Sequence, residues 1–74
     1  MNIEFSLSDA RAKARALAAL QEHGYDATTG GIRLAYPFAV LVREVASDDV
    51  DTVRRLVTAV DPAAGSIVPA AVTV

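Results

Sequence analysis

The segment Phe38–Val42 constrains the fold most, because it contains five consecutive apolar residues and no polar side chain. Successive residues of a β-strand point to opposite faces of the sheet. An unbroken apolar run in a strand therefore places apolar side chains on both faces. A small domain covers one face of a sheet with its helices and has little chain left for the other. The sequence thus predicts a sheet with one partly apolar, uncovered face.

The chain has 74 residues, which is the size of one small domain, and we interpret residues 1–74 as a single unit. It is 53% apolar and 22% charged with a net charge of −2, so it is predicted to be globular. It contains no Cys and one His, which excludes disulfides and makes a metal site unexpected. Self-association is the remaining common source of added stability for a small core.

Alternating apolar residues at Ile3, Phe5 and Leu7 predict a strand with one buried face. Ser8 is a candidate N-cap for a helix over Asp9–His23, which Gly24 ends. The apolar side of this helix is predicted to comprise Ala10, Ala14, Ala16, Leu17 and Leu20.

Two interpretations are open for the middle of the chain. In the first, which we prefer, Tyr25–Leu34 is one strand interrupted by a glycine bulge at Gly30-Gly31, and Pro37 lies near the turn into a strand over Phe38–Val45. In the second, Gly30-Gly31 is itself a hairpin turn.

A second helix is predicted to start at Ser47-Asp48-Asp49 and to stop at Asp61-Pro62. Its apolar residues recur at spacings of three and four, at Val50, Val53, Leu56, Val57 and Val60. Ser66–Val74 is predicted to be an edge strand, because Pro69 cannot donate a ladder hydrogen bond. The resulting βαββαβ order predicts an α+β, ferredoxin-like plait: a four-stranded antiparallel sheet with two helices on one face.

Residues that could carry chemistry are few. His23 falls in the last helical turn, where an imidazole satisfies free carbonyls. Asp48, Asp49 and Asp51 suit the first turn of a helix, and they lack the alternating pattern of a calcium loop. We therefore expect no catalytic residue, no metal and no cofactor.

Nucleic-acid binding is also not expected. RNA-recognition modules share this topology and stack bases on aromatic residues of the central strands. Here Tyr36 and Phe38 lie near the third strand without the basic-Gly-aromatic pattern of that family. The net charge of −2 offers no general attraction to nucleic acid or to anionic lipid.

The two faces of the third strand can be assigned from alternation. Phe38, Val40, Val42 and Glu44 form one set, and we expect it to face the helices through Val42. Ala39, Leu41, Arg43 and Val45 form the other set, of which we expect Ala39 and Leu41 on the open face and Arg43 toward its rim. We expect a partner to contact three residues of the second set and two nearby tyrosines. These five residues are Ala39, Leu41, Arg43, Tyr25 and Tyr36.

These patterns favour a small non-enzymatic module of the cytoplasm that binds a protein through its open sheet face, as a homodimer or with another protein. The alternative is a regulatory domain that senses a small molecule at a dimer interface. Strand addition at the edge strand Ser66–Val74 is a competing mode of binding. No membrane association is expected, because no apolar run approaches the length of a transmembrane helix.

Overall fold

The computed structural model describes residues 1–30 and 37–67 of the chain. Four strands, two α-helices and one short 3₁₀ helix follow one another along these residues. They are β1 (Ile3–Ser6), α1 (Ala10–Glu22), β2 (Asp26–Thr29), β3 (Ala39–Arg43), η1 (Ser47–Asp49), α2 (Val50–Val60) and β4 (Gly65–Ile67).

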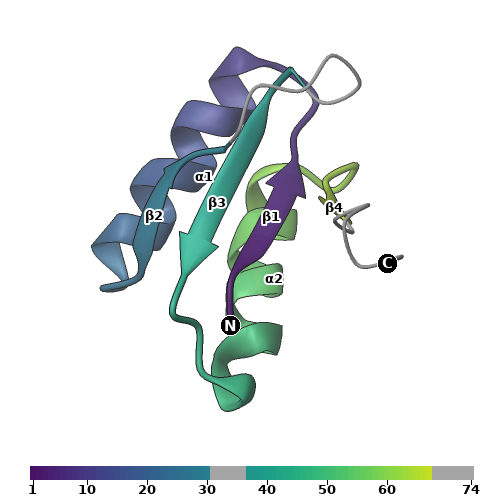
Figure 1. Ribbon diagram of the computed structural model, residues 1–74. Coiled ribbons are helices and arrows are strands. Elements are labelled where there is room, and N and C mark those ends of the chain that lie inside the picture. The colour runs from purple at the N-terminus through teal and green to yellow at the C-terminus, as the bar shows by residue number, and fades with distance from the viewer. Residues whose placement is uncertain (31–36, 68–74) are drawn as a thin grey trace, which may run out of the picture.

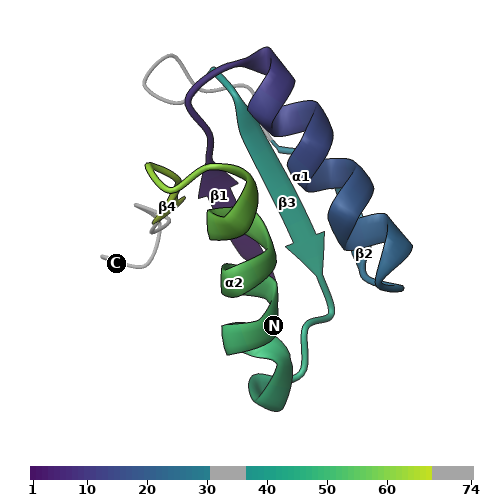
Figure 2. The ribbon, with the colours of Figure 1, turned by 180° about the vertical axis from the view of Figure 1, so that it is seen from behind.

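The strands form one sheet in the order β2-β3-β1-β4, and the β2–β3, β3–β1 and β1–β4 pairs are all antiparallel. In Figure 1 the sheet faces the viewer and both helices lie behind it. The reverse view in Figure 2 shows α1 and α2 side by side on that hidden face. The predicted ferredoxin-like α+β fold is therefore confirmed.

The core lies between the sheet and the two helices. Phe5 is paired in register with Val40, and Val42 lies between Ile3 and Ala27. These strand residues meet the helix residues Ala16, Leu20, Val53 and Val57, each of which is fully buried. The predicted helix-facing set Phe38, Val40 and Val42 does pack on the core, with Phe38 only partly buried.

Helix α1 begins one residue later than predicted. Its N-cap is Asp9, whose carboxylate accepts a hydrogen bond from the Ala12 backbone N–H at 2.7 Å, whereas Ser8 precedes the cap. At the other end Gly24 adopts a φ of +85°, which glycine tolerates and other residues rarely adopt. The predicted termination at Gly24 is confirmed.

The predicted apolar side of α1 is partly wrong. Ala16, Leu17 and Leu20 pack on the core, but Ala10 and Ala14 are exposed. Two residues turn an α-helix through about 200°, so Ala14 points away from the side that Ala16 buries. Ala12, one turn before Ala16, takes its place against the core.

Strand β3 is shorter than predicted, and its alternation ends at Glu44. Glu44 has a φ of 56°, in the left-handed region, which interrupts the pleat. Consequently Val45 is buried in the core, with 2% of its surface exposed, and Glu44 is exposed. The alternation that groups Val45 with Leu41 therefore does not extend past Glu44.

Pairing between β2 and β3 extends one residue beyond Thr29, because the Gly30 N–H donates to the Ala39 carbonyl oxygen at 2.8 Å. The proposed continuation of this strand to Leu34, the role of Gly31 and the position of Tyr36 lie outside the described residues. The same holds for the proposed last strand beyond Ile67.

Helix α2 agrees closely with its prediction. Ser47–Asp49 forms η1, and Val50–Val60 continues as the α-helix with Asp61 as its C-cap. Val53 and Val57 are buried, and the three other predicted apolar residues are partly buried against the core. Within the described ranges, neither α-helix has the length and hydrophobicity needed to cross a membrane.

Candidate functional site

The face of the sheet opposite the helices is the first candidate site. Its residues have the opposite parity to Phe5 and Val40 in the strand register. We call this surface the open face and define it by Glu4, Ser6, Asp26, Thr28, Ala39, Leu41 and Arg43.

Leu41 lies at the centre of the open face. It is paired with Glu4 of β1 on one side and with Thr28 of β2 on the other. All three residues are partly exposed. Among the open-face residues of β1, β2 and β3, Leu41 is therefore the one large apolar side chain, and its register partners Glu4 and Thr28 are polar, so this part of the face is more polar than the apolar run alone indicated.

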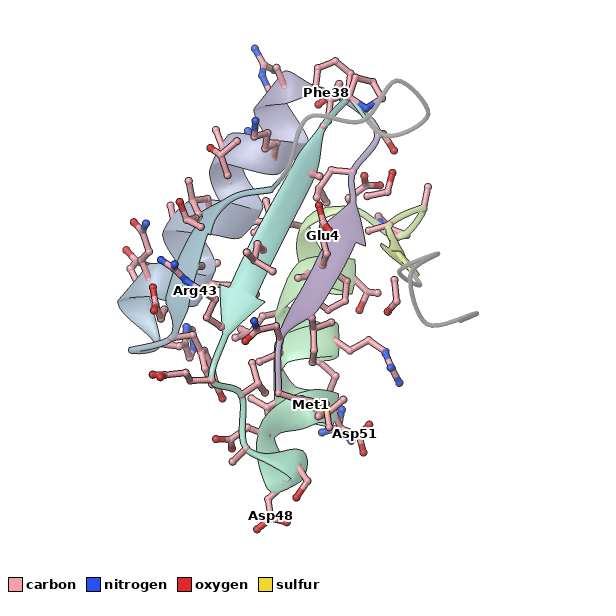
Figure 3. The ribbon with its side chains drawn as sticks, viewed as in Figure 1. Met1, Glu4, Phe38, Arg43, Asp48 and Asp51 are labelled. Atoms are coloured by element: carbon pink, nitrogen blue, oxygen red, sulfur yellow. The ribbon has the colours of Figure 1, made fainter. Side chains whose placement is uncertain are left out.

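An ion pair borders Leu41 toward the C-terminal end of β3. Arg43 and Asp26 are cross-strand partners, and Nε and Nη2 of Arg43 each lie 3.5 Å from a carboxylate oxygen of Asp26. Their side chains are 49% and 54% exposed, so water screens the pair strongly. Figure 3 shows Arg43 and Glu4 on the side of the sheet away from the helices.

The opposite end of the open face is closely packed. Ala39 is only 2% exposed although it lies on the face without helices. A Cβ atom built on Gly30 would lie 2.7 Å from the Cβ of Ala39 and 2.7 Å from a carboxylate oxygen of Glu4. Gly30, Ala39 and Glu4 thus form a tight corner in which only glycine fits at position 30.

The predicted contact residues do not all meet. Ala39, Leu41 and Arg43 share the open face as expected, although the burial of Ala39 leaves it little surface for contact. Tyr25 lies on the other side, partly buried against the core, because it has the same strand parity as Ala27. Tyr36 lies outside the described residues.

The β2 edge of the sheet is partly covered. The backbone of Ala27 points away from β3, since Thr28 and Gly30 take the paired positions. Its carbonyl oxygen accepts a hydrogen bond from the Gln21 side chain of α1 at 3.1 Å, and its N–H donates to the Tyr25 carbonyl oxygen at 3.0 Å. Another strand adding at this edge would have to displace both bonds.

A second candidate is a hollow of about 190 Å³ between the start of α1 and the end of α2. Its lining includes two cations of α1, Arg11 and Arg15, and two carboxylates, Asp9 and Asp61. The remaining lining residues are Ser8, Ala12 and Val60. Asp61 is 7% exposed and its oxygens are occupied: Oδ2 accepts from the Ser8 N–H at 2.7 Å and Oδ1 from the Ala63 N–H at 3.0 Å.

The Ser8 hydroxyl also bonds to the Asp61 carboxylate. This bond lowers the pKa of Asp61 most, and the backbone N–H groups of Ser8 and Ala63 act in the same direction against the effect of burial. Asp61 is a structural tie that sequence reasoning missed, because Asp61-Pro62 was interpreted only as a helix stop. A short polar residue directly after a helix was the available signal.

The other polar residues singled out from the sequence have structural partners. His23 Nδ1 lies 2.9 Å from the Ala19 carbonyl oxygen at the end of α1, as predicted for a capping residue. Asp51 is in the first turn of α2, 3.9 Å from Arg54. In residues 1–30 and 37–67, no group of three His, Cys, Asp or Glu side chains is placed to hold a metal ion.

No protein-family model, curated protein or solved structure matches this chain. The class that the fold defines is a small ferredoxin-like α+β domain, and any function must come from its own surfaces.

Proposed function

We propose that this domain is a non-enzymatic protein-binding module that uses the open face. The observation that carries the proposal is Leu41, a leucine that stays partly exposed at the centre of a sheet face that neither α1 nor α2 covers. A leucine on a helix-covered face of the same sheet would be buried, as Phe5 and Val40 are.

The composition of the open face suits an interface. Interfaces between proteins that form and dissociate combine an apolar centre with a polar rim. Leu41 supplies such a centre, and Glu4, Thr28, Asp26 and Arg43 supply polar and charged groups around it. One leucine and a rim of this kind fit a moderate, reversible contact better than a large obligate interface.

The open face is also favoured over the β2 edge. The backbone of Ala27 is already bonded to Gln21 and Tyr25, so that edge offers fewer free hydrogen-bonding groups to an incoming strand. The Leu41 side chain is apolar, so a partner that contacts it replaces no hydrogen bond of that side chain.

Capture experiments with two matched variants test the proposal. Leu41→Asp places a charge at the centre of the open face, and Thr52→Asp places the same charge on the exposed side of α2. We expect wild type and Thr52→Asp to retain the same bound protein and Leu41→Asp to lose it. Equal capture by both variants, with circular dichroism showing both folded, would contradict binding through the open face.

The small-molecule-sensing alternative, the absence of a cofactor and the cytoplasmic location stay predictions from the sequence. A thermal-shift screen with amino acids and nucleotides tests the sensing alternative, because a ligand that binds only the folded state raises the unfolding temperature.

A further inference from the structure

The hollow between the start of α1 and the end of α2 has room for a small ligand. Its volume is about 190 Å³, which is below the range of about 300–1,000 Å³ that is usual for pockets of drug-sized molecules. The helices that form it lie on the side of the sheet opposite the open face (Figure 2). A ligand bound in the hollow therefore leaves the open face free for a protein.

Charges of both signs line the hollow in equal number. Arg11 and Arg15 are one turn apart on α1, so their side chains lie on the same side of that helix. The two carboxylates are those of Asp9 and Asp61. A ligand with a net charge gains little attraction from a lining whose formal charges cancel, whereas a ligand that carries both charges is attracted at both ends.

The two arginines are not neutralised by carboxylates of the chain. Across residues 1–30 and 37–67, ion pairs join an arginine of β3 and an arginine of α2 to aspartates, but none includes Arg11 or Arg15. Two like charges one turn apart on a helix repel each other slightly. A carboxylate bound between them removes this repulsion and accepts hydrogen bonds from both guanidinium groups.

The two carboxylates of the hollow differ in what they can still accept. Both oxygens of Asp61 accept backbone N–H groups, from Ser8 at 2.7 Å and from Ala63 at 3.0 Å. Asp9 uses Oδ1 for the Ala12 N–H at 2.7 Å, and in the described part of the chain its Oδ2 forms no hydrogen bond. Asp9 is also exposed, so its Oδ2 is the carboxylate oxygen that a ligand cation reaches more easily.

We propose that the hollow binds a free α-amino acid as its zwitterion, with the ligand carboxylate on Arg11 and Arg15 and the ligand ammonium on Oδ2 of Asp9. Ala12 and Val60 add partly buried apolar surface, which suits a small aliphatic side chain. The charged contacts are exposed and screened by water, so the affinity is weak, in the millimolar range. This site is independent of protein binding through the open face.

An NMR titration of the isotope-labelled chain with L-alanine provides the test. L-Alanine carries both charges, acetate only the negative one and ethylammonium only the positive one. We expect L-alanine to shift the amide resonances of residues 8–12 and 60–61 saturably. Acetate and ethylammonium should each bind about 2–5-fold more weakly, because each lacks one charged contact. Acetate or inorganic phosphate that binds as tightly as L-alanine would overturn the zwitterion in favour of a simple anion.

Asp9→Asn and Arg15→Gln separate the two ends of the ligand. Asparagine caps a helix as well as aspartate does, and glutamine forms helix about as readily as arginine, so both variants should keep the fold. Each should weaken L-alanine binding about 2–5-fold. Asp9→Asn should not weaken acetate binding, since acetate has no ammonium group to lose its partner.

Arg55→Gln is the matched control, because Arg55 is exposed on α2 and does not line the hollow. It should bind L-alanine as wild type does, and circular dichroism verifies the fold of each variant. The absence of saturable shifts in wild type, or equal weakening by Arg15→Gln and Arg55→Gln, overturns the proposal.

Discussion

The carboxylate of Asp61 accepts a hydrogen bond of 2.7 Å from the backbone N–H of Ser8, 53 residues earlier in the chain. Ser8 connects β1 to α1, and Asp61 is the C-cap of α2. The same carboxylate accepts the Ala63 N–H, which holds the chain as it turns toward β4. One buried side chain thus joins the start of one helix to the end of the other.

Removal of this carboxylate should destabilise the domain. In Asp61→Ala the N–H and hydroxyl of Ser8 lose their acceptor at a site where Asp61 is only 7% exposed. We expect Asp61→Ala to lower the thermal unfolding temperature measurably, and Asp61→Asn to lower it less because the amide keeps one acceptor oxygen. Asp51→Ala, on an exposed turn of α2, is the control and should change little. Equal melting temperatures for wild type and Asp61→Ala would contradict the role of the tie.

The Asp61 carboxylate also predicts how the stability of the fold depends on pH. The pKa of Asp61 in the folded state is lower than its ordinary value of 3.8, with the Ser8 hydroxyl as the largest cause. A carboxylate with a depressed pKa stabilises the fold above its unfolded pKa, and this contribution is lost as the pH falls through the folded pKa. The difference in unfolding temperature between wild type and Asp61→Asn should therefore be largest above about pH 5 and shrink below pH 3.8. A difference that stays constant down to pH 2 would show that the ionised carboxylate is not what stabilises the fold.

The sequence predicted those parts of the fold that depend on periodicity. Alternation at Ile3 and Phe5, and the spacing of Val53 and Val57, are imposed by burial against one face, so the pattern of apolar residues reports the element directly. The order of the elements then leaves few topologies, and the ferredoxin-like arrangement is the one observed.

Residues whose position depends on a local backbone change or on long-range contact could not be predicted in this way. Val45 is in the core because Glu44 takes a left-handed conformation, which nothing in the apolar pattern signals. Ala39 is buried on the open face, and a Cβ on Gly30 would lie close to both Ala39 and Glu4, an approach between three separate parts of the chain that no local pattern signals. The partner of Asp61 lies 53 residues away, beyond the reach of any local pattern.

The tight corner at Gly30 predicts a large effect from one methyl group. In Gly30→Ala the new Cβ would lie 2.7 Å from the Cβ of Ala39 and 3.1 Å from its backbone carbonyl carbon, and the backbone atom cannot move aside easily. Such overpacking costs about 1–3 kcal/mol. Gly65→Ala is the matched control, because its Cβ would meet no atom within 4 Å and the loss of chain entropy on folding would be smaller. Urea denaturation should show Gly30→Ala destabilised and Gly65→Ala close to wild type; the reverse order would disprove the close approach.

The left-handed backbone of Glu44 predicts a stabilising substitution. A non-glycine residue with a φ of 56° is strained, and glycine adopts this conformation freely. Glu44→Gly relieves the strain but gives the unfolded chain more freedom, so the net gain in the free energy of unfolding should be about 0.5–1 kcal/mol. The Glu44 side chain is exposed, and the backbone N–H that donates to Asn2 Oδ1 at 3.1 Å is kept.

Ala46→Gly separates conformational strain from chain entropy. Ala46 lies two residues later, is also exposed, and has a φ of −67°, which alanine adopts without strain. Glycine there adds only the entropy cost and should lower the free energy of unfolding by about 0.5–1 kcal/mol. Chemical denaturation of both variants should move the unfolding midpoint in opposite directions. If Glu44→Gly and Ala46→Gly both lower the free energy of unfolding, the backbone of Glu44 is not strained.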